Sequence, residues 1–268
     1  MRKRWIYILL MFALIVGYVL FLNYYEKEDV NEAPQIIFKE AHMELSVNDE
    51  KSRLLEGVQA IDKEDGDLTS DIIIDSISAF DGKKNRTVRY VVFDKENKAT
   101  QASRTISYVD YQPPKILLND SLIQNTISVT KINKMIEAVS CVDGDISNNV
   151  DVNIGKLQDN QVVLKIHVYD STGTESNISV VLEYDKNQYP IKINLKDYML
   201  YVPVGENYDL KGNIFEILQG NQPVQMYDDM IRVESNVDFN TPGVYEVYYT
   251  LNEDAGNAAR AKAIIVVE

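Results

Sequence analysis

The sequence predicts an all-β chain of tandem antiparallel β-sandwiches behind one N-terminal transmembrane helix. Three observations predict this fold class. A charge-free apolar segment lies near the N-terminus, a proline-led pattern of short alternating strands recurs about every 80 residues, and helical periodicity is hard to find elsewhere. The chain has 268 residues, of which 45% are hydrophobic and 25% are charged, a balance typical of folded domains rather than of a disordered tail.

The apolar segment Trp5–Leu22 contains no charged residue. As a helix it would be about 27 Å long, close to the ~30 Å hydrocarbon core of a bilayer. The basic residues at positions 2–4 place the N-terminus in the cytoplasm and the bulk of the chain outside. We therefore predict a cytoplasmic stub at residues 1–4, a transmembrane signal anchor at residues 5–23 and a linker at residues 24–32.

A cleaved signal peptide is the alternative to this anchor. The apolar core is longer than the usual ~7–15 residues of such a peptide, and no small-x-small cleavage site follows it. We therefore favour an uncleaved anchor and a single-pass protein of the cell membrane.

The charge balance excludes one class of partner. The 27 basic and 41 acidic residues give a formal net charge of −14, and such a surface repels phosphates, so we expect no nucleic-acid ligand. One cysteine and two histidines exclude a disulfide framework and a Cys/His zinc cluster. Because the neighbours of Cys141 are acidic or apolar, we expect a small buried side chain rather than a reactive thiol.

Three repeats follow the anchor, and each opens with a proline and an alternating apolar strand. The prolines are Pro34, Pro114 and Pro190, and we place the repeats at residues 33–110, 111–186 and 187–268. Later in each repeat comes a longer alternating strand that ends in a turn, at Val88–Asp94, Val162–Asp170 and Val244–Glu253. About seven strands in ~80 residues without crossover helices predict a β-sandwich. The junctions are too short to decouple the domains, and we expect three sandwiches in line.

Shared motifs carry a resemblance to a known family. A D-G-D-[LI]-[TS] turn occurs at Asp65–Thr69 and at Asp143–Ser147, while the third repeat has T-P-G-V-Y at Thr241–Tyr245 and D-A-G-N at Asp254–Asn257. Together these motifs resemble the bacterial immunoglobulin-like domain of surface proteins, also called the pesticidal-crystal-protein Ig-like domain. The resemblance covers roughly residues 33–268 and implies Ig-like sandwiches that serve as spacer or adhesive modules, without implying an activity.

The acidic turn of the first repeat is the best metal candidate. Four residues offer hard oxygen ligands around a glycine, as calcium sites do: Asp62, Glu64, Asp65 and Asp67. In the second repeat Ser140 and Val142 replace the first two, so the ligand set is not kept. We therefore favour turns whose carboxylates accept hydrogen bonds from backbone N–H groups, and we predict no metal and no cofactor. Calcium stays open for the turn acids Asp65, Asp67, Asp143 and Asp145.

Catalytic machinery is not indicated. His42 and His167 lie beside or within predicted strands, and the chain has no G-x-S-x-G elbow, no H-E-x-x-H motif and no phosphate-binding loop. A glycosidase needs only two carboxylates, but sandwich repeats of this size lack the deep cleft that such a pair occupies. We therefore predict no catalytic residues and no enzyme. Some Ig-like adhesins carry a Lys–Asn cross-link, and we expect the corresponding pair, Lys115 and Asn177, to be unlinked.

The predicted function is a membrane-anchored surface protein whose repeats act in binding, adhesion or spacing. The alternative is an envelope-assembly or enzyme-accessory factor that acts on a membrane or wall partner. We expect a protein or carbohydrate ligand at the third repeat, where the neutral loop Leu218–Pro223 replaces the D-G-D turn. Four aromatic residues there could add contact area if they are exposed: Tyr201, Tyr208, Phe215 and Tyr227.

Overall fold

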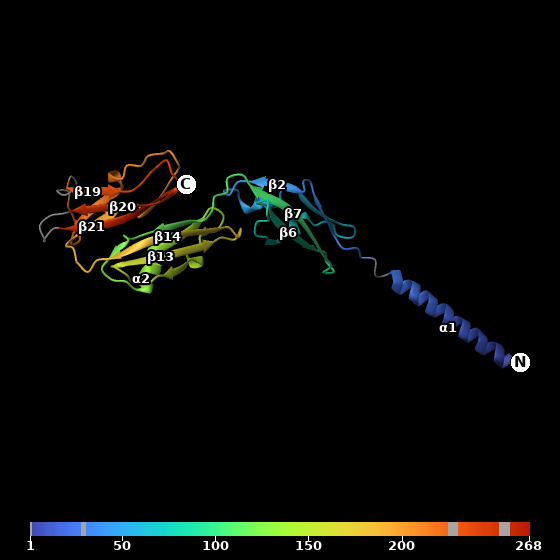
Figure 1. Ribbon diagram of the computed structural model, residues 1–268. Helices are drawn as coiled ribbons and strands as arrows, with labels where there is room; N and C mark the ends of the chain where they lie inside the picture. The colour runs from blue at the N-terminus through green and yellow to red at the C-terminus, as the bar shows by residue number, and fades with distance from the viewer. Residues whose placement is uncertain (1, 28–30, 225–229, 252–257) are drawn as a thin grey trace. The chain divides into compact units, whose positions relative to one another are not determined.

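The computed structural model of the chain describes residues 2–27, 31–224, 230–251 and 258–268. The described part contains one long N-terminal helix followed by short strands arranged in small sheets (Figure 1). It divides into two compact units: the first runs to Ser107 without residues 46–48, and the second contains those three residues and residues 108–268. A mostly β chain with one apolar N-terminal helix confirms the predicted fold class.

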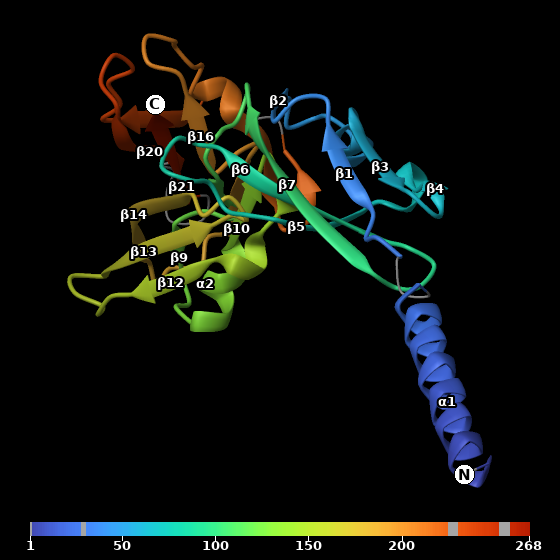
Figure 2. The same cartoon turned by 90° about the vertical axis from the view of Figure 1, so that its right-hand side faces the viewer.

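Helix α1 spans Arg2–Lys27, so it extends beyond the predicted anchor at both ends. Figure 2 shows it as one uninterrupted rod. No part of its apolar stretch Trp5–Leu22 is buried against protein. A helix that is apolar on all sides and long enough to cross a bilayer suits a lipid environment.

The first repeat contains seven strands in two sheets, with the orders β1-β3-β4 and β2-β7-β6-β5. Its strands alternate as predicted, and Ala60, Val88 and Tyr90 are fully buried between the sheets. A 3-10 turn at Lys51–Leu55 connects β2 to β3. The strands are β1 (Gln35–Phe38), β2 (His42–Leu45), β3 (Val58–Asp62), β4 (Gly66–Asp67), β5 (Ile73–Ile77), β6 (Arg86–Phe93) and β7 (Ala99–Tyr108).

The second repeat has the same strand arrangement, in the sheets β8-β10-β11 and β9-β14-β13-β12. A short helix that the sequence analysis did not predict, α2 (Val129–Met135), takes the place of the 3-10 turn, and Ser128 caps its N-terminus. The strands are β8 (Lys115–Leu118), β9 (Ile123–Gln124), β10 (Ile136–Ser140), β11 (Gly144–Asp145), β12 (Asp151–Ile154), β13 (Gln161–Tyr169) and β14 (Glu175–Tyr184).

The third repeat follows the same plan again, in the sheets β15-β17-β18 and β16-β21-β20-β19. Strand two of each sandwich therefore lies beside strand seven, and for β16 and β21 this pairing is parallel. The strands are β15 (Ile191–Leu195), β16 (Met199–Val202), β17 (Ile214–Gln219), β18 (Gln222–Pro223), β19 (Ile231–Ser235), β20 (Gly243–Leu251) and β21 (Ala259–Val267). The motif at Asp254–Asn257 lies outside the described residues.

The second and third repeats form a single compact unit, and one apolar cluster runs through both of them. This differs from the expected row of separate sandwiches. Leu122, which is fully buried, joins the two repeats through its backbone: its carbonyl accepts from the Glu183 N–H at 2.7 Å in β14, and its N–H donates to the Lys262 carbonyl at 3.3 Å in β21. Leu122 therefore makes one backbone hydrogen bond within the second repeat and one to the third repeat.

Tyr201 of β16 makes a second link between these repeats. Its hydroxyl accepts from the Ile116 N–H at 3.0 Å and donates to the Ile116 carbonyl at 2.9 Å, on the free edge of β8. An exposed strand edge can pair with a strand of another chain, because its backbone N–H and C=O groups are free. A side chain that bonds to both backbone groups of one edge residue blocks such pairing at that residue. The third repeat therefore covers part of an edge of the second.

Candidate functional site

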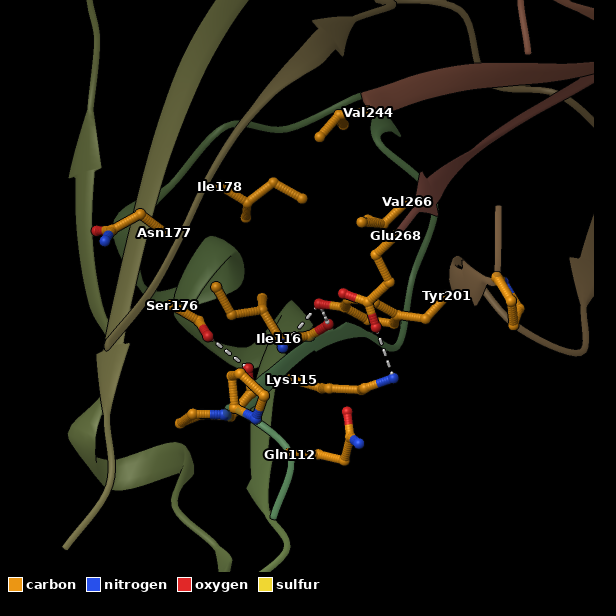
Figure 3. Close-up of a pocket in the computed structure, with 13 residues that line it drawn as sticks. Gln112, Lys115, Ile116, Ser176, Asn177, Ile178, Tyr201, Val244, Val266 and Glu268 are labelled. Carbon is orange, nitrogen blue, oxygen red and sulfur yellow. Dashed lines mark hydrogen bonds and ion pairs between the residues drawn. The ribbon is translucent and has the colours of Figure 1, made fainter. Parts of the chain in front are cut away.

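A cleft of about 570 Å³ lies in the second unit, where the second and third repeats meet (Figure 3). Its apolar lining comes from both repeats, with Ile116 and Ile178 from the second and Val244 and Val266 from the third. Strands β8, β14, β20 and β21 supply these side chains, because each strand ends or begins at the meeting point. The lining depends on both repeats, so the cleft exists only while they are packed together.

An ion pair and an aromatic ring form one side of this cleft. Lys115 Nζ lies 2.9 Å from Glu268 Oε1 and 4.6 Å from the centroid of the Tyr201 ring, which places a cation over an aromatic face. Burial raises the pKa of Tyr201, so its hydroxyl stays protonated and can keep its two bonds to Ile116. The wall is therefore fixed, with one charged pair at its rim.

Lys115 and Asn177, the pair that we expected to be unlinked, both line the cleft but are not brought together. In Figure 3 the Asn177 amide lies on the opposite side from Lys115, whose ammonium group is directed toward Glu268. Ser176 donates to the Pro114 carbonyl at 2.6 Å, so its hydroxyl is already occupied. The arrangement offers an apolar floor with polar edges.

The D-G-D turn of the first repeat is held by its own carboxylates. Asp62 Oδ1 accepts from the N–H groups of Glu64 and Asp65, and Asp67 accepts from the N–H of Thr69. Asp65 accepts from the Lys95 N–H and pairs with Lys95 Nζ at 2.8 Å. These hydrogen bonds, with Lys95 and Thr69 as the main partners, lower the pKa values of Asp65 and Asp67.

The second repeat keeps this turn with a different residue. Ser140 Oγ accepts from the N–H groups of Val142 and Asp143, as Asp62 does in the first repeat. Asp143 accepts from the Ser171 N–H and hydroxyl, and Asp145 accepts from Ser147, which lowers the pKa of Asp145. The carboxylates therefore serve the turns, as predicted. Across the described residues, no three His, Cys, Asp or Glu side chains converge as a preformed metal cluster.

The other residues singled out in the sequence lie apart from one another. His42 contacts the hydroxyls of Thr105 and Ser107 in the first unit, while His167 lies 3.4 Å from Glu175 in the second. Cys141 is exposed, so the expectation of a buried thiol was wrong. It lies just after β10, and its Sγ donates to the Gln112 carbonyl at 3.1 Å within the second repeat.

The aromatic residues of the third repeat do not form one exposed patch. Tyr201 is held against the second repeat, and Tyr208 is half-buried with its hydroxyl 3.4 Å from Asn213 Oδ1. Phe215 is 66% exposed, and Tyr227 lies outside the described residues. The neutral loop Leu218–Pro223 forms the hairpin between β17 and β18. Binding at this hairpin therefore stays a prediction.

A buried lysine is the main feature that sequence reasoning missed. Lys262 of β21 is fully buried, and its Nζ lies 3.1 Å from Glu183 Oε1, 2.7 Å from Glu246 Oε1 and 3.0 Å from the Val181 carbonyl. The Tyr248 hydroxyl donates to Glu183 Oε1 at 2.6 Å, and burial together with the two carboxylates raises its pKa. This cluster links β14 of the second repeat to β20 and β21 of the third.

One signal in the sequence could have indicated this cluster. Lys262 follows Ala261 in a closing strand that is otherwise almost wholly apolar. A lysine among buried strand residues must find partners for its charge, since an unpaired buried ammonium group is strongly unfavourable. The identity of those partners needed the structure, because Glu183 belongs to another repeat.

Comparison with known proteins identifies one segment. Residues 191–267 match the family model of the bacterial surface protein Ig-like domain. No curated protein matches the chain.

Several solved structures align with the chain at low similarity. A structure of the CBM51-2 domain in complex with GlcNAc and INT domains from Clostridium perfringens ZmpB has 16% identity and a TM-score of 0.24, covering 88% of this chain and 42% of that one. The ZmpB M60 catalytic domain with its two CBM51 domains has 12% identity and a TM-score of 0.23, covering 87% and 30%. The extracellular cadherin domains 1–5 of protocadherin gamma B2 have 10% identity and a TM-score of 0.20, covering 89% and 61%.

The chain spans less than half of the ZmpB structures that it matches, and alignments with TM-scores this low establish no common ligand. The family match stands on its own, and it coincides with the seven strands β15–β21. The resemblance noted in the sequence is thereby confirmed for the third repeat, whose residues 191–267 match the bacterial surface Ig-like domain.

Proposed function

We propose that the chain is a single-pass bacterial cell-surface protein, without catalytic activity of its own, that binds a protein or carbohydrate ligand in the cleft between its second and third repeats. The observation that carries this proposal is the cleft itself, which is lined by both repeats, and a buried ionic cluster joins the same two repeats. The surface-protein match of residues 191–267 supports the extracellular location.

Helix α1 supports the membrane attachment. Its window Trp5–Leu22 is long enough to cross a bilayer and has no protein surface packed on it. Basic residues at positions 2–4 favour a cytoplasmic N-terminus. A cleaved signal peptide would share these features, so the two possibilities need a direct test.

In a topology experiment on intact cells, we expect external protease to digest the repeats and to leave a small membrane-bound fragment. The fragment should contain the anchor, because the bilayer protects α1 while the repeats lie outside. Mass spectrometry of the membrane fraction would identify it, and an N-terminal tag that resists protease until the cells are lysed is the control. A mature protein without residues 1–22 in the medium would establish a signal peptide instead.

The cleft suits a ligand with an apolar part and a polar part. Ile178 and Val266 offer apolar contact, while the Lys115–Glu268 pair at the rim can exchange hydrogen bonds with a polar group. The aromatic face of Tyr201 is already covered by the Lys115 ammonium group, so it contributes to the wall rather than acting as an open stacking platform.

Replacing Val244 by arginine should weaken ligand capture at least about tenfold, because a desolvated guanidinium group in the cleft costs about 1.4 kcal/mol or more. Val244 is 45% exposed, so the fold should tolerate the change. The measurement is quantitative capture of envelope proteins and glycans by the full chain in nanodiscs. Phe215→Arg, at a site 66% exposed on β17 of the third repeat, is the matched control. Loss of capture with Phe215→Arg alone would place the ligand on the third repeat outside the cleft.

A further inference from the structure

Three polar side chains gather at one end of the first repeat, next to the D-G-D turn. Asp62 ends β3 and is 3% exposed, while Asp94 directly follows β6 and is 5% exposed. Asn31 Nδ2 donates to Asp94 Oδ2 at 2.7 Å and to Glu96 Oε2 at 3.1 Å. The Lys98 ammonium group donates to the Asn31 carbonyl at 2.7 Å and holds this segment in place.

Two oxygens in this group have no hydrogen-bond donor. Within the described part of the chain, Asp62 Oδ2 and Asn31 Oδ1 are the buried side-chain atoms without a partner. Asp62 Oδ1 accepts the hydrogen bonds of the turn, so Oδ2 is the oxygen without a donor. A buried acceptor without a donor is unfavourable, and a native structure normally supplies a proton donor, a water or an ion.

The second repeat shows what occupies this place when donors are present. Its counterparts are Tyr111, three residues before the repeat's opening proline as Asn31 is, Ser140 at the end of β10, and Asp170 directly after β13. The Ser140 hydroxyl donates to Asp170 Oδ2 at 3.1 Å, and the Tyr111 hydroxyl donates to the same oxygen at 2.8 Å. One buried carboxylate is therefore satisfied by two hydroxyl groups.

The first repeat replaces both hydroxyl donors. Asp62 accepts from the same two turn N–H groups as Ser140 does, and from the contact of Ser140 with Asp170 we infer that the Asp62 carboxylate is directed toward Asp94. Two buried carboxylates now lie where the second repeat has one carboxylate and a hydroxyl. Two adjacent carboxylates favour a cation between them, and Glu96 adds to the negative field, while the nearby ammonium group of Lys95 is paired with Asp65 at 2.8 Å.

We propose that this end of the first repeat binds a calcium ion through Asp62 Oδ2, the Asp94 carboxylate and the side-chain oxygen of Asn31. All three are hard oxygen ligands, which Ca²⁺ prefers, and water with Glu96 can complete its 6–8 ligands. The Asn31 amide would turn so that Oδ1 faces the ion, because the carboxylates then need no N–H donor. The site differs from the D-G-D turn acids, whose oxygens are already occupied by Lys95 and Thr69.

The test is the melting temperature of the detergent-solubilised full chain after EDTA treatment, with and without millimolar CaCl₂. We expect calcium to raise the transition of the first repeat by roughly 5 °C at tenfold excess over Kd. Asp62→Ser should abolish this shift without unfolding the repeat, because Ser140 shows that serine holds the same turn and can donate to the neighbouring carboxylate. Asp94→Asn should abolish it as well.

Asp143→Asn is the matched control, since Asp143 is a turn acid of the second repeat with Ser171 as its partner. It should leave the calcium shift unchanged. Failure of calcium to shift the wild-type transition would overturn the proposal, and so would a full shift retained by Asp62→Ser. A melting temperature that rises on acidification and ignores calcium would show that a shared proton, not a cation, satisfies the two carboxylates, and would also overturn it.

Discussion

Replacing Lys262 by methionine is expected to lower the free energy of unfolding of the second unit by about 3–5 kcal/mol. Lys262 is fully buried, and its ammonium group is the partner of Glu183 and Glu246. Without it the two carboxylates are left with the Tyr248 hydroxyl between them and with Arg260, whose Nη2 lies 3.6 Å from Glu183 Oε2. Methionine keeps the apolar stem of lysine, so the loss reports on the charge rather than on packing.

Differential scanning calorimetry and hydrogen exchange of β14 and β21 would measure this change, because both strands should exchange through opening of the joint between repeats. Arg232→Met is the control: Arg232 pairs with Glu234 on the surface, with 69% and 54% of the side chains exposed, and such pairs contribute at most about 1 kcal/mol. Adding Glu183→Gln to Lys262→Met should recover part of the loss, since one unpaired charge disappears. Equal effects of Lys262→Met and Arg232→Met would show that the cluster does not hold the repeats together.

The cluster of Lys262, Glu183 and Glu246 joins the two repeats that line the cleft. Ile116 and Ile178 belong to the second repeat and Val244 and Val266 to the third, so separation of the repeats would open the lining to water. Lys262→Met should therefore weaken ligand capture as well as stability. The Lys115–Glu268 pair at the cleft is half-exposed and contributes little to this cohesion.

Most of the fold within each repeat follows from local patterns. The predicted strand Val88–Asp94 corresponds to β6 at Arg86–Phe93, and Val244–Glu253 corresponds to β20 at Gly243–Leu251. Alternation with a period of two places every second side chain in the core, so a sandwich strand can be recognised from a few consecutive residues. The opening prolines marked the repeats because each precedes the first strand of its sandwich.

The arrangement of the second and third repeats could not be read in this way. Glu183 and Lys262 are far apart in the sequence, and nothing in either strand alone indicates that the two residues meet. Helix α2 was missed because it is a single short segment with only Ile132 and Met135 buried, too few positions to define a helical period. The cleft depends on how the two repeats pack, so the sequence directed attention to the hairpin at Leu218–Pro223 instead.

For calcium, too, local sequence patterns indicated the turns, whereas the candidate site depends on how the strands pack. The sequence analysis favoured turn acids over a metal site because Ser140 replaces Asp62 in the second repeat, and in the structure both residues accept hydrogen bonds from the turn N–H groups. It did not indicate that Asp94 and Asp62 hold the places of Asp170 and Ser140, which contact each other in the second repeat. Only the comparison with Asp170 in the second repeat makes the missing donors visible.

Replacing Arg104 by methionine is expected to lower the free energy of unfolding of the first repeat by about 2–3 kcal/mol. Arg104 of β7 is 3% exposed, and its guanidinium group donates to the Leu54 carbonyl at 2.7 Å, the Glu56 carbonyl at 2.9 Å and the Tyr90 hydroxyl at 2.9 Å. Methionine cannot donate to these acceptors, and the Glu56 carbonyl would lose the side-chain donor that it has here. The 3-10 turn at Lys51–Leu55 should therefore loosen first.

Hydrogen exchange at residues 51–58 and the melting temperature of the first repeat would measure the effect of Arg104→Met. Arg89→Met is the control on the neighbouring strand β6, because its partner Asp75 lies 3.7 Å away and both side chains are about half-exposed. Tyr90→Phe should lower the free energy of unfolding by less than Arg104→Met does, since the Leu54 carbonyl keeps its hydrogen bond from the guanidinium group. The third repeat has the same tyrosine anchor without an arginine: Tyr249 donates to the Leu210 carbonyl at 2.8 Å, and burial raises its pKa to about 12. Tyr249→Phe should thus lower the free energy of unfolding of its repeat by more than Tyr90→Phe does. The reverse order would show that Arg104 does not help to stabilise the turn.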